Sequence, residues 1–185
     1  MNNLKKGIIG FVLMGFCGLF ASGFQEQRAS LYDWKFEERG PISGHSGPFY
    51  PSNVQFIGNW PFGPSYAVAY DGVRNLVFCG AGGGVYILDV SNPSSPVKVS
   101  EAIRTRGFVC GLFYDSSNQR LYIAGGPVGI EIWDISNPSS PYKLGYYFIP
   151  DYTLAVYVMG SYAYVADYSA GLRIIDVSNP SSPYE

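Results

Sequence analysis

One eight-residue string occurs three times in this chain of 185 residues and constrains its fold more than any other feature. The string Asp-Val-Ser-Asn-Pro-Ser-Ser-Pro occupies residues 89–96, returns at 134–141 with Ile135 in place of Val90, and returns unchanged at 176–183. Successive copies start 45 and then 42 residues apart. A period near 40 residues predicts a repeat architecture in which each unit is a small module stacked on the next.

Each unit contains segments with the composition of short β-strands, separated by the Gly, Asp, Asn and Ser residues that favour hairpin corners. The third segment of each unit alternates apolar residues on one face, as strands do. The fourth is more polar, which is expected of an outer edge strand. The predicted strands are 66–70, 76–79, 85–89 and 97–103 in the first unit, 110–114, 121–124, 130–134 and 142–148 in the second, and 155–159, 163–166 and 172–176 in the third.

The second segment of each unit is an uninterrupted apolar run that ends in a small residue, namely Cys79, Ala124 or Ala166. A strand that is covered on both faces has this composition, because neither face meets water. We expect these three residues to be equivalent and to lie where the units converge. In the third segment, we expect the residues that begin the second face to lie near an edge of the sheet: Tyr86, Glu131 and Arg173.

The shared string predicts a sharp corner after the third strand. Its Asp and Ser side chains accept hydrogen bonds from nearby backbone N–H groups, and its prolines lack the N–H that a continuing strand would need. The glycine that opens each third strand indicates a backbone with positive φ or a close approach; these are Gly84, Gly129 and Gly171. The residues assigned to the corners are Asp89, Asn92, Pro93, Asp134, Asn137, Pro138, Asp176, Asn179 and Pro180.

Four short antiparallel strands in about 40 residues predict one blade of a β-propeller. The expected fold class is all-β, a partial β-propeller with three four-stranded antiparallel blades of 42–45 residues at about 61–103, 104–148 and 149–185. A stacked solenoid of β-hairpins is the alternative, although its usual periods are shorter. Propellers have four to eight blades, so the ring is expected to be incomplete.

The third unit carries the residues of a known repeat. Its strings Leu-Arg-Ile-Ile-Asp-Val-Ser-Asn-Pro at 172–180 and Ala-Tyr-Val-Ala-Asp at 163–167 resemble the LVIVD repeat of bacterial and archaeal exported proteins, and the resemblance covers 64–185. It implies a propeller, in a family whose members generally carry no assigned chemistry. Trp133 and Asp134 stand where a WD40 repeat has its Trp-Asp pair, but the other units have Leu-Asp and Ile-Asp, and the Gly-His signature is absent.

The first 23 residues have the layout of a secretory signal peptide. Lys5 and Lys6 precede an apolar run at 8–20, and small residues follow at 21–23, where a signal peptidase would cut. An uncleaved anchor helix is the alternative, and it would be the chain's one contact with a membrane. We therefore expect a secreted, periplasmic or cell-surface protein. Residues 24–53 are predicted to form an N-terminal extension or linker.

Residues 54–60 have the composition of an outer strand displaced to the front of the repeats. The third unit meanwhile reaches Tyr184 and Glu185 where its own fourth strand would begin. We therefore expect further blades, supplied either by a longer chain or by another subunit. In the first case, 54–60 would pair with the last blade and close the ring.

No catalytic, cofactor-binding or metal-binding residue is predicted. The single histidine, His45, lies in the predicted linker without partners for a triad. Cys79 and Cys110 lie in apolar runs and are expected to be buried thiols, although export permits a disulfide. Calcium at the corner aspartates is an alternative to turn capping, but each corner offers one carboxylate and calcium prefers several.

These observations predict an exported, non-catalytic interaction or scaffold module with a protein or glycan partner. Nucleic acid is not expected, because no run of Lys and Arg follows residue 6. The alternative is a fragment of a propeller enzyme, a hydrolase or lyase, whose catalytic loops lie outside this chain. Asp167 is expected to be an exposed loop residue, and a carboxylate that points toward the propeller axis is the alternative. Aromatic residues that form either a contact patch or core are Tyr146, Tyr147, Phe148, Tyr152 and Tyr168.

Overall fold

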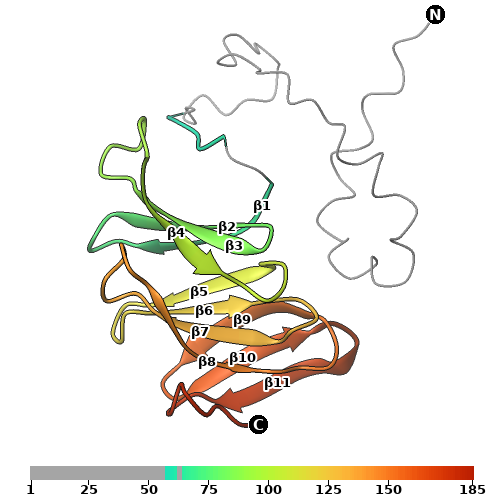
Figure 1. Cartoon of the computed structure of the whole chain (residues 1–185). Helices are drawn as coiled ribbons and strands as arrows, with labels where there is room; N and C mark the ends of the chain where they lie inside the picture. Colours follow the sequence, from blue (N-terminus) through green and yellow to red (C-terminus); the bar gives the residue numbers. More distant parts are fainter. Residues whose placement is uncertain (1–56, 62–63) are drawn as a thin grey trace, which may run out of the picture.

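A computed structural model describes residues 57–61 and 64–185, which fold into three antiparallel β-sheets (Figure 1). We call these sheets blades 1, 2 and 3. Blade 1 contains β1 Ser65–Asp71, β2 Leu76–Ala81, β3 Gly84–Asp89 and β4 Val97–Arg104. Blade 2 contains β5 Gly111–Asp115, β6 Arg120–Ala124, β7 Ile130–Asp134 and β8 Tyr142–Tyr147. Blade 3 contains β9 Thr153–Met159, β10 Tyr162–Asp167 and β11 Gly171–Asp176.

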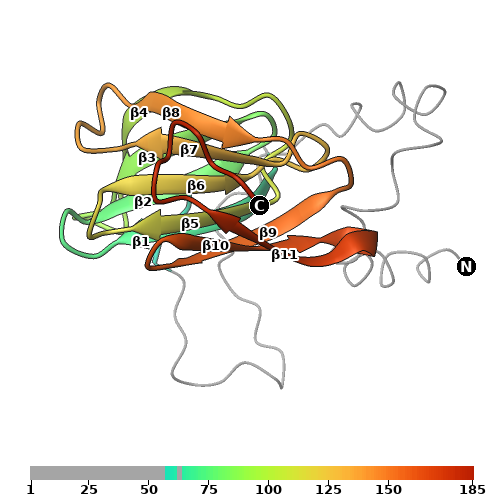
Figure 2. The ribbon, with the colours of Figure 1, turned by 90° about the horizontal axis from the view of Figure 1, so that it is seen from below.

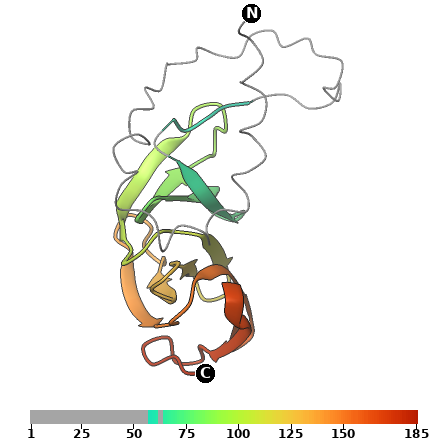
Figure 3. The ribbon, with the colours of Figure 1, turned by 90° about the vertical axis from the view of Figure 1, so that its right-hand side faces the viewer.

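The all-β fold class is confirmed, with sheets of four, four and three strands. Each sheet keeps its strands in chain order from β1, β5 or β9 outward, so each repeat builds one blade. Blade 2 lies between blades 1 and 3, and Figures 1 and 3 show the same order from two sides. Figure 2 shows the blades overlapping when the stack is seen from below. The sheets do not close into a ring.

Two apolar clusters hold the blades together. One joins Phe78 and Ile87 of blade 1 to Leu121 and Ile123 of blade 2. The other joins a different set of blade 2 residues, including Tyr122 and Ile132, to blade 3 residues including Val156, Val165 and Ile175. Each blade therefore has a forward face, which packs on the following blade, and a rear face, which packs on the preceding one. Blade 2 uses both faces, which explains why residues 121–124 of its second strand are all apolar.

The strand register corrects one sequence-based equivalence. Ala124 pairs with Ile130, and Ala166 with Leu172, but in blade 1 the residue in this place is Gly80, which pairs with Val85. Cys79 instead pairs with Tyr86 on the rear face. The turn from β2 to β3 has two residues, Gly82 and Gly83, whereas the turn in blade 3 has three, 168–170. The sequence-based equivalence counts the same number of residues back from the glycine that opens each third strand. In blade 1 this count falls one residue too early, on Cys79 instead of Gly80.

The recurring glycines meet the predicted backbone requirement in two ways. Gly129 and Gly171 have φ angles of 83° and 79°, which residues with a Cβ rarely adopt. At Gly84 the reason is proximity, because a Cβ there would lie 2.8 Å from the carbonyl oxygen of Ile103. Cys79 and Cys110 are thiols in the described structure, and both are half-buried rather than fully buried.

Each corner is built from two nested side-chain turns. Oδ1 of Asp89, Asp134 and Asp176 accepts a hydrogen bond of 2.8 Å from the backbone N–H two residues ahead. Oδ1 of the Asn three residues later does the same at 3.2 Å. The backbone N–H groups that the corner leaves without strand partners are thereby satisfied by local oxygens.

The predicted signal segment, the extension 24–53 with His45, and residues 54–56 lie outside the described residues. Ile57 to Pro61 has no regular secondary structure. Between residues 57 and 185, apart from 62 and 63, no helix has the length and apolar character that a membrane span needs.

Candidate functional site

The strand connections place different chemistry at the two ends of the blades. One end, the corner end, carries the three Asp-Asn corners and the turns between the first and second strands. At the opposite end, Gly84 pairs with Arg104 and Ala81, and Ile130 pairs with Tyr147 and Ala124. The second-to-third strand turns and the links from one blade to the next therefore lie together. We call this the crossover end.

The crossover end exposes aromatic side chains on both links between blades and on the second turn of blade 3. Phe108, Phe148 and Tyr168 are 59%, 58% and 52% exposed, and Tyr146 is 49% exposed. The guanidinium of Arg106 lies 4.5 Å from the centre of the Tyr146 ring, a cation–π geometry. We call these five residues the aromatic end surface. Among the aromatic residues singled out from the sequence, Tyr147 and Tyr152 are instead half-buried.

A buried carboxylate holds the link that carries Arg106 and Phe108. Oε1 of Glu131 accepts a hydrogen bond of 3.0 Å from the Arg106 backbone N–H. Oε2 accepts one of 3.0 Å from Nε1 of Trp133 and lies 2.9 Å from Nζ of Lys143. Glu131 is fully buried, so the expectation that it lies near a sheet edge was wrong. A carboxylate is tolerated there because three donors replace its water.

The prediction that Asp167 is exposed was also wrong, because its side chain is fully buried. Its Oδ2 lies 2.5 Å from Nε of Arg173, whose Nη1 reaches the Glu185 carboxylate at 2.8 Å. Within the described residues, Oδ1 of Asp167 and Oγ1 of Thr153 have no hydrogen-bond partner. Asp167 lies two residues after Val165, which packs against blade 2, so its carboxylate is on the same face of β10.

A third charged group spans blades 1 and 2 at the corner end. Arg74 contacts the Asp71 carboxylate through Nε at 2.5 Å, and Asp71 is almost fully buried. Burial raises the pKa of Asp71, but hydrogen bonds from the Arg74 side chain, the backbone N–H groups of Arg74 and Val73, and Tyr114 outweigh this effect and lower the pKa. Asp71 is therefore an ionised structural anchor.

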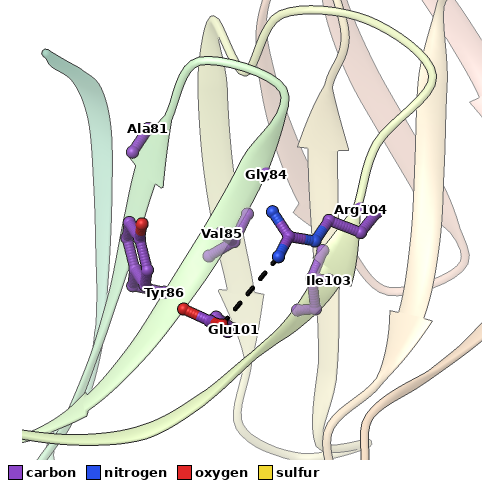
Figure 4. A pocket seen from close by; sticks show the side chains of 7 residues that line it. All are labelled: Ala81, Gly84, Val85, Tyr86, Glu101, Ile103 and Arg104. Carbon is purple, nitrogen blue, oxygen red and sulfur yellow. Dashed lines mark ion pairs between the residues drawn. The ribbon is translucent and has the colours of Figure 1, made fainter. Parts of the chain in front are cut away.

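Two hollows on the described surface differ in size and lining. One, with a volume of about 30 Å³, is lined by Tyr86, Glu101, Arg104 and four neighbours (Figure 4). This has room for water but not for a metabolite. Another, of about 380 Å³, lies at the corner end between 113–118 and 158–160. Its carboxylate, Asp115, already accepts hydrogen bonds from the N–H groups of Ser117 and Asn118.

No group of three or more His, Cys, Asp or Glu side chains converges anywhere in the described ranges. The corner aspartates lie one per blade, each occupied by its own turn. These turns could be predicted from the sequence. The buried carboxylates could not, because the order of charged residues along the chain carries no signal of their burial.

Comparison with known proteins places this architecture among β-propellers. The profile of the LVIVD repeat matches residues 75–102, 119–148 and 152–185, once in each blade. The β-propeller domain of Cps50 (Swd1) from Myceliophteria thermophila superposes with a TM-score of 0.50 at 14% identity, over 66% of this chain and 38% of that one. A structural genomics protein of unknown function from Bacteroides thetaiotaomicron gives 0.50 and 14%, over 66% and 31%.

These likenesses concern the fold alone. The chain spans about a third of the length of each of the two structures. No curated protein matches it in sequence.

Proposed function

The chain belongs to the LVIVD repeat family, and from this premise we propose that it is an exported, non-catalytic propeller-type module that binds a protein or glycan partner through its crossover end. The single observation that carries the proposal is the aromatic end surface. Aromatic residues and Arg are enriched at binding interfaces, and Tyr and Arg are among the residues that contribute most to binding energy there. Here they are exposed at one end of the molecule.

The charged side chains support a binding role over a catalytic one. Glu131, Asp167 and Asp71 each hold a basic side chain in a structural contact. Their geometry stabilises the interfaces between blades and the links that present the aromatic residues. A hydrolase or lyase needs an acid and a base that converge on a reacting atom, and these carboxylates lie apart within the blade packing.

Export is supported by residues 1–23. Their basic start, apolar run and small-residue end match a secretory signal. Fractionation of a bacterial host that expresses the full chain tests this part of the proposal. We expect the protein outside the cytoplasm, shortened by the signal segment. Protein of full length in the cytoplasm would refute export.

Photo-crosslinking tests the binding role. A benzophenone amino acid at position 148 of the full chain is expected to form an adduct with a defined protein or glycan. Position 97 is the matched control, because Val97 is 60% exposed but lies on β4 away from the aromatic end surface. Adducts of equal yield at both positions, or none at position 148, would refute this use of the crossover end.

A further inference from the structure

Blades 1 and 3 each expose one face whose counterpart in blade 2 is buried. On the forward face of blade 3, Leu172 and Ile174 are 66% and 48% exposed. Their counterparts in blade 2 by register, Ile130 and Ile132, are fully buried against blade 3. The forward face of blade 3 thus has the apolar composition of a blade interface and no described neighbour.

The rear face of blade 1 shows the complementary situation. Val68 and Tyr70 are 67% and 54% exposed. They pair with Cys79 and Val77, as Leu112 and Tyr114 pair with Ile123 and Leu121 in blade 2. In blade 2 this rear face packs on blade 1. One molecule therefore exposes one forward face and one rear face, the two kinds that meet at both of its internal interfaces.

The segment before blade 1 shows where the missing neighbour belongs. A Cβ at Gly145, in the outer strand of blade 2, would lie 2.1 Å from the carbonyl oxygen of Pro180 in the corner of blade 3. A Cβ at Gly58 would lie 2.4 Å from the carbonyl oxygen of Pro93 in the corner of blade 1. Gly58 therefore contacts blade 1 as the outer strand of a preceding blade would.

Among the described residues, blade 3 has no strand in the place that this segment would take. Its sheet ends at β11, which no described fourth strand covers. Beyond the corner, Tyr184 pairs with Asp176 through backbone hydrogen bonds of 2.7 and 3.2 Å, which is how a fourth strand begins in blades 1 and 2. Blade 3 needs an outer strand and a following blade, whereas the segment at Gly58 needs the inner strands of a preceding blade.

We propose that a second copy of this chain supplies both. The forward face of blade 3 packs on the rear face of the partner's blade 1, and residues 57–60 of each copy lie along β11 of the other. Each of the two contacts between copies joins a forward face to a rear face. Two copies of three blades therefore close a six-bladed ring with twofold symmetry. Six falls within the four to eight blades that propellers use, and a head-to-tail contact forms a ring when its rotation closes.

One copy cannot make these contacts with itself, because blades 1 and 3 lie on opposite sides of blade 2 (Figures 1 and 3). Contact between two forward faces is disfavoured, because both internal interfaces join a forward face to a rear face. Blades of a longer chain would fill the same places, and the experiment below distinguishes that source from a second copy.

The test is the mass in solution of the protein recovered after expression of the full chain, measured by light scattering after size exclusion. We expect twice the mass of one chain. Leu172→Asp, on the forward face, and Val68→Asp, on the rear face, are each expected to halve it. Val97→Asp is the matched control, since Val97 is 60% exposed on β4, and it should leave the dimer intact.

Mixing the two variants shows whether unlike faces meet. Each variant alone has no intact pair of faces, but the mixture can form one intact contact, so dimers should reappear, weaker than in the unaltered protein. This result also shows that both variants remain folded. A monomeric unaltered protein would overturn the proposal and leave both faces to blades of a longer chain. A dimer that resists Val68→Asp, a mixture that stays monomeric, or a mass that rises without limit would overturn it as well.

Discussion

Nη2 of Arg74 in blade 1 donates a hydrogen bond of 2.6 Å to the phenol oxygen of Tyr114 in blade 2. Nη1 of the same guanidinium donates to the carbonyl oxygen of Ile135 at 2.8 Å, and Nε contacts Asp71 at 2.5 Å. One side chain thus ties a turn of blade 1 to two elements of blade 2 at the margin of an apolar interface. Propeller blades that pack through apolar faces alone would slide more easily, so this contact also determines how the two blades align.

Replacing Arg74 with Met should destabilise the protein by about 2 kcal/mol, because it removes hydrogen bonds from a charged donor and leaves the buried Asp71 carboxylate without its cation. Urea unfolding followed by circular dichroism measures the change. Arg104→Met is the matched control, because the Arg104 side chain is 74% exposed. Equal stabilities of the two variants would show that the contact across the blades contributes nothing.

Replacing Gly145 with Ala should destabilise the protein by about 1–3 kcal/mol, as overpacking does in close-packed interiors. The added methyl group would lie 2.1 Å from the carbonyl oxygen of Pro180, so β8 and the third corner would have to separate. Gly83→Ala is the control, because the nearest atom to its methyl group would be 3.9 Å away. A thermal midpoint for Gly145→Ala that equals the midpoint of the control would contradict this packing.

Stability should fall as the solution is made more acidic. The hydroxyl and N–H of Ser91 lower the pKa of Asp89, and those of Ser178 lower the pKa of Asp176. At Asp134 burial raises the pKa, but hydrogen bonds from Ser136 and Tyr142 outweigh it and lower the pKa. Groups with a lowered folded-state pKa stabilise the fold fully above the unfolded value, about 3.9, and lose this contribution as the pH falls through the folded value.

Urea titrations between pH 7 and pH 2 measure this dependence. Asp134→Asn keeps an acceptor for the turn but removes the titrating group, so its loss of stability on acidification should be smaller than that of the unaltered protein. The two proteins would lose stability equally if the charge on Asp134 played no part.

Calcium should not change the stability of the repeats. Each corner carboxylate already accepts local N–H donors, and calcium needs six to eight oxygens. We expect the same thermal midpoint in excess calcium and in excess chelator. A midpoint that rises with calcium concentration would show that the folded state binds the ion and would revise the role given to Asp89, Asp134 and Asp176.

The blades and corners could be predicted because they rest on local chemistry repeated three times. Asp, Asn and Pro at fixed spacing make the same turn wherever they occur, and a short apolar run between turns favours a strand covered on both faces. The register of β2 could not be obtained by counting, because the turn after Ala81 is one residue shorter than its counterparts. A difference of one residue moves side chains to the opposite face of the strand.

The buried charges were beyond reach of the sequence for a different reason. Arg74 and Ile135 are 61 residues apart along the chain, and Arg106 reaches Glu131 from the link between blades 1 and 2. Such contacts depend on how the blades are placed relative to one another, which no local pattern specifies. Glu131 was expected near an edge because it begins the second face of its strand, at the place that Tyr86 and Arg173 occupy in the other units. The groups that donate hydrogen bonds to the Glu131 carboxylate come together only in the folded stack of blades.

At both internal interfaces, the forward face of one blade packs on the rear face of the next. A double-mutant cycle between Phe78 and Tyr114, whose ring centroids lie 4.9 Å apart across blades 1 and 2, measures this packing. With both residues changed to Leu, singly and together, we predict a coupling of about 1 kcal/mol. The same cycle with Phe113, which contacts Tyr157 on the other face of blade 2, should give none. Coupling of Phe78 to Phe113, or none to Tyr114, would contradict the packing.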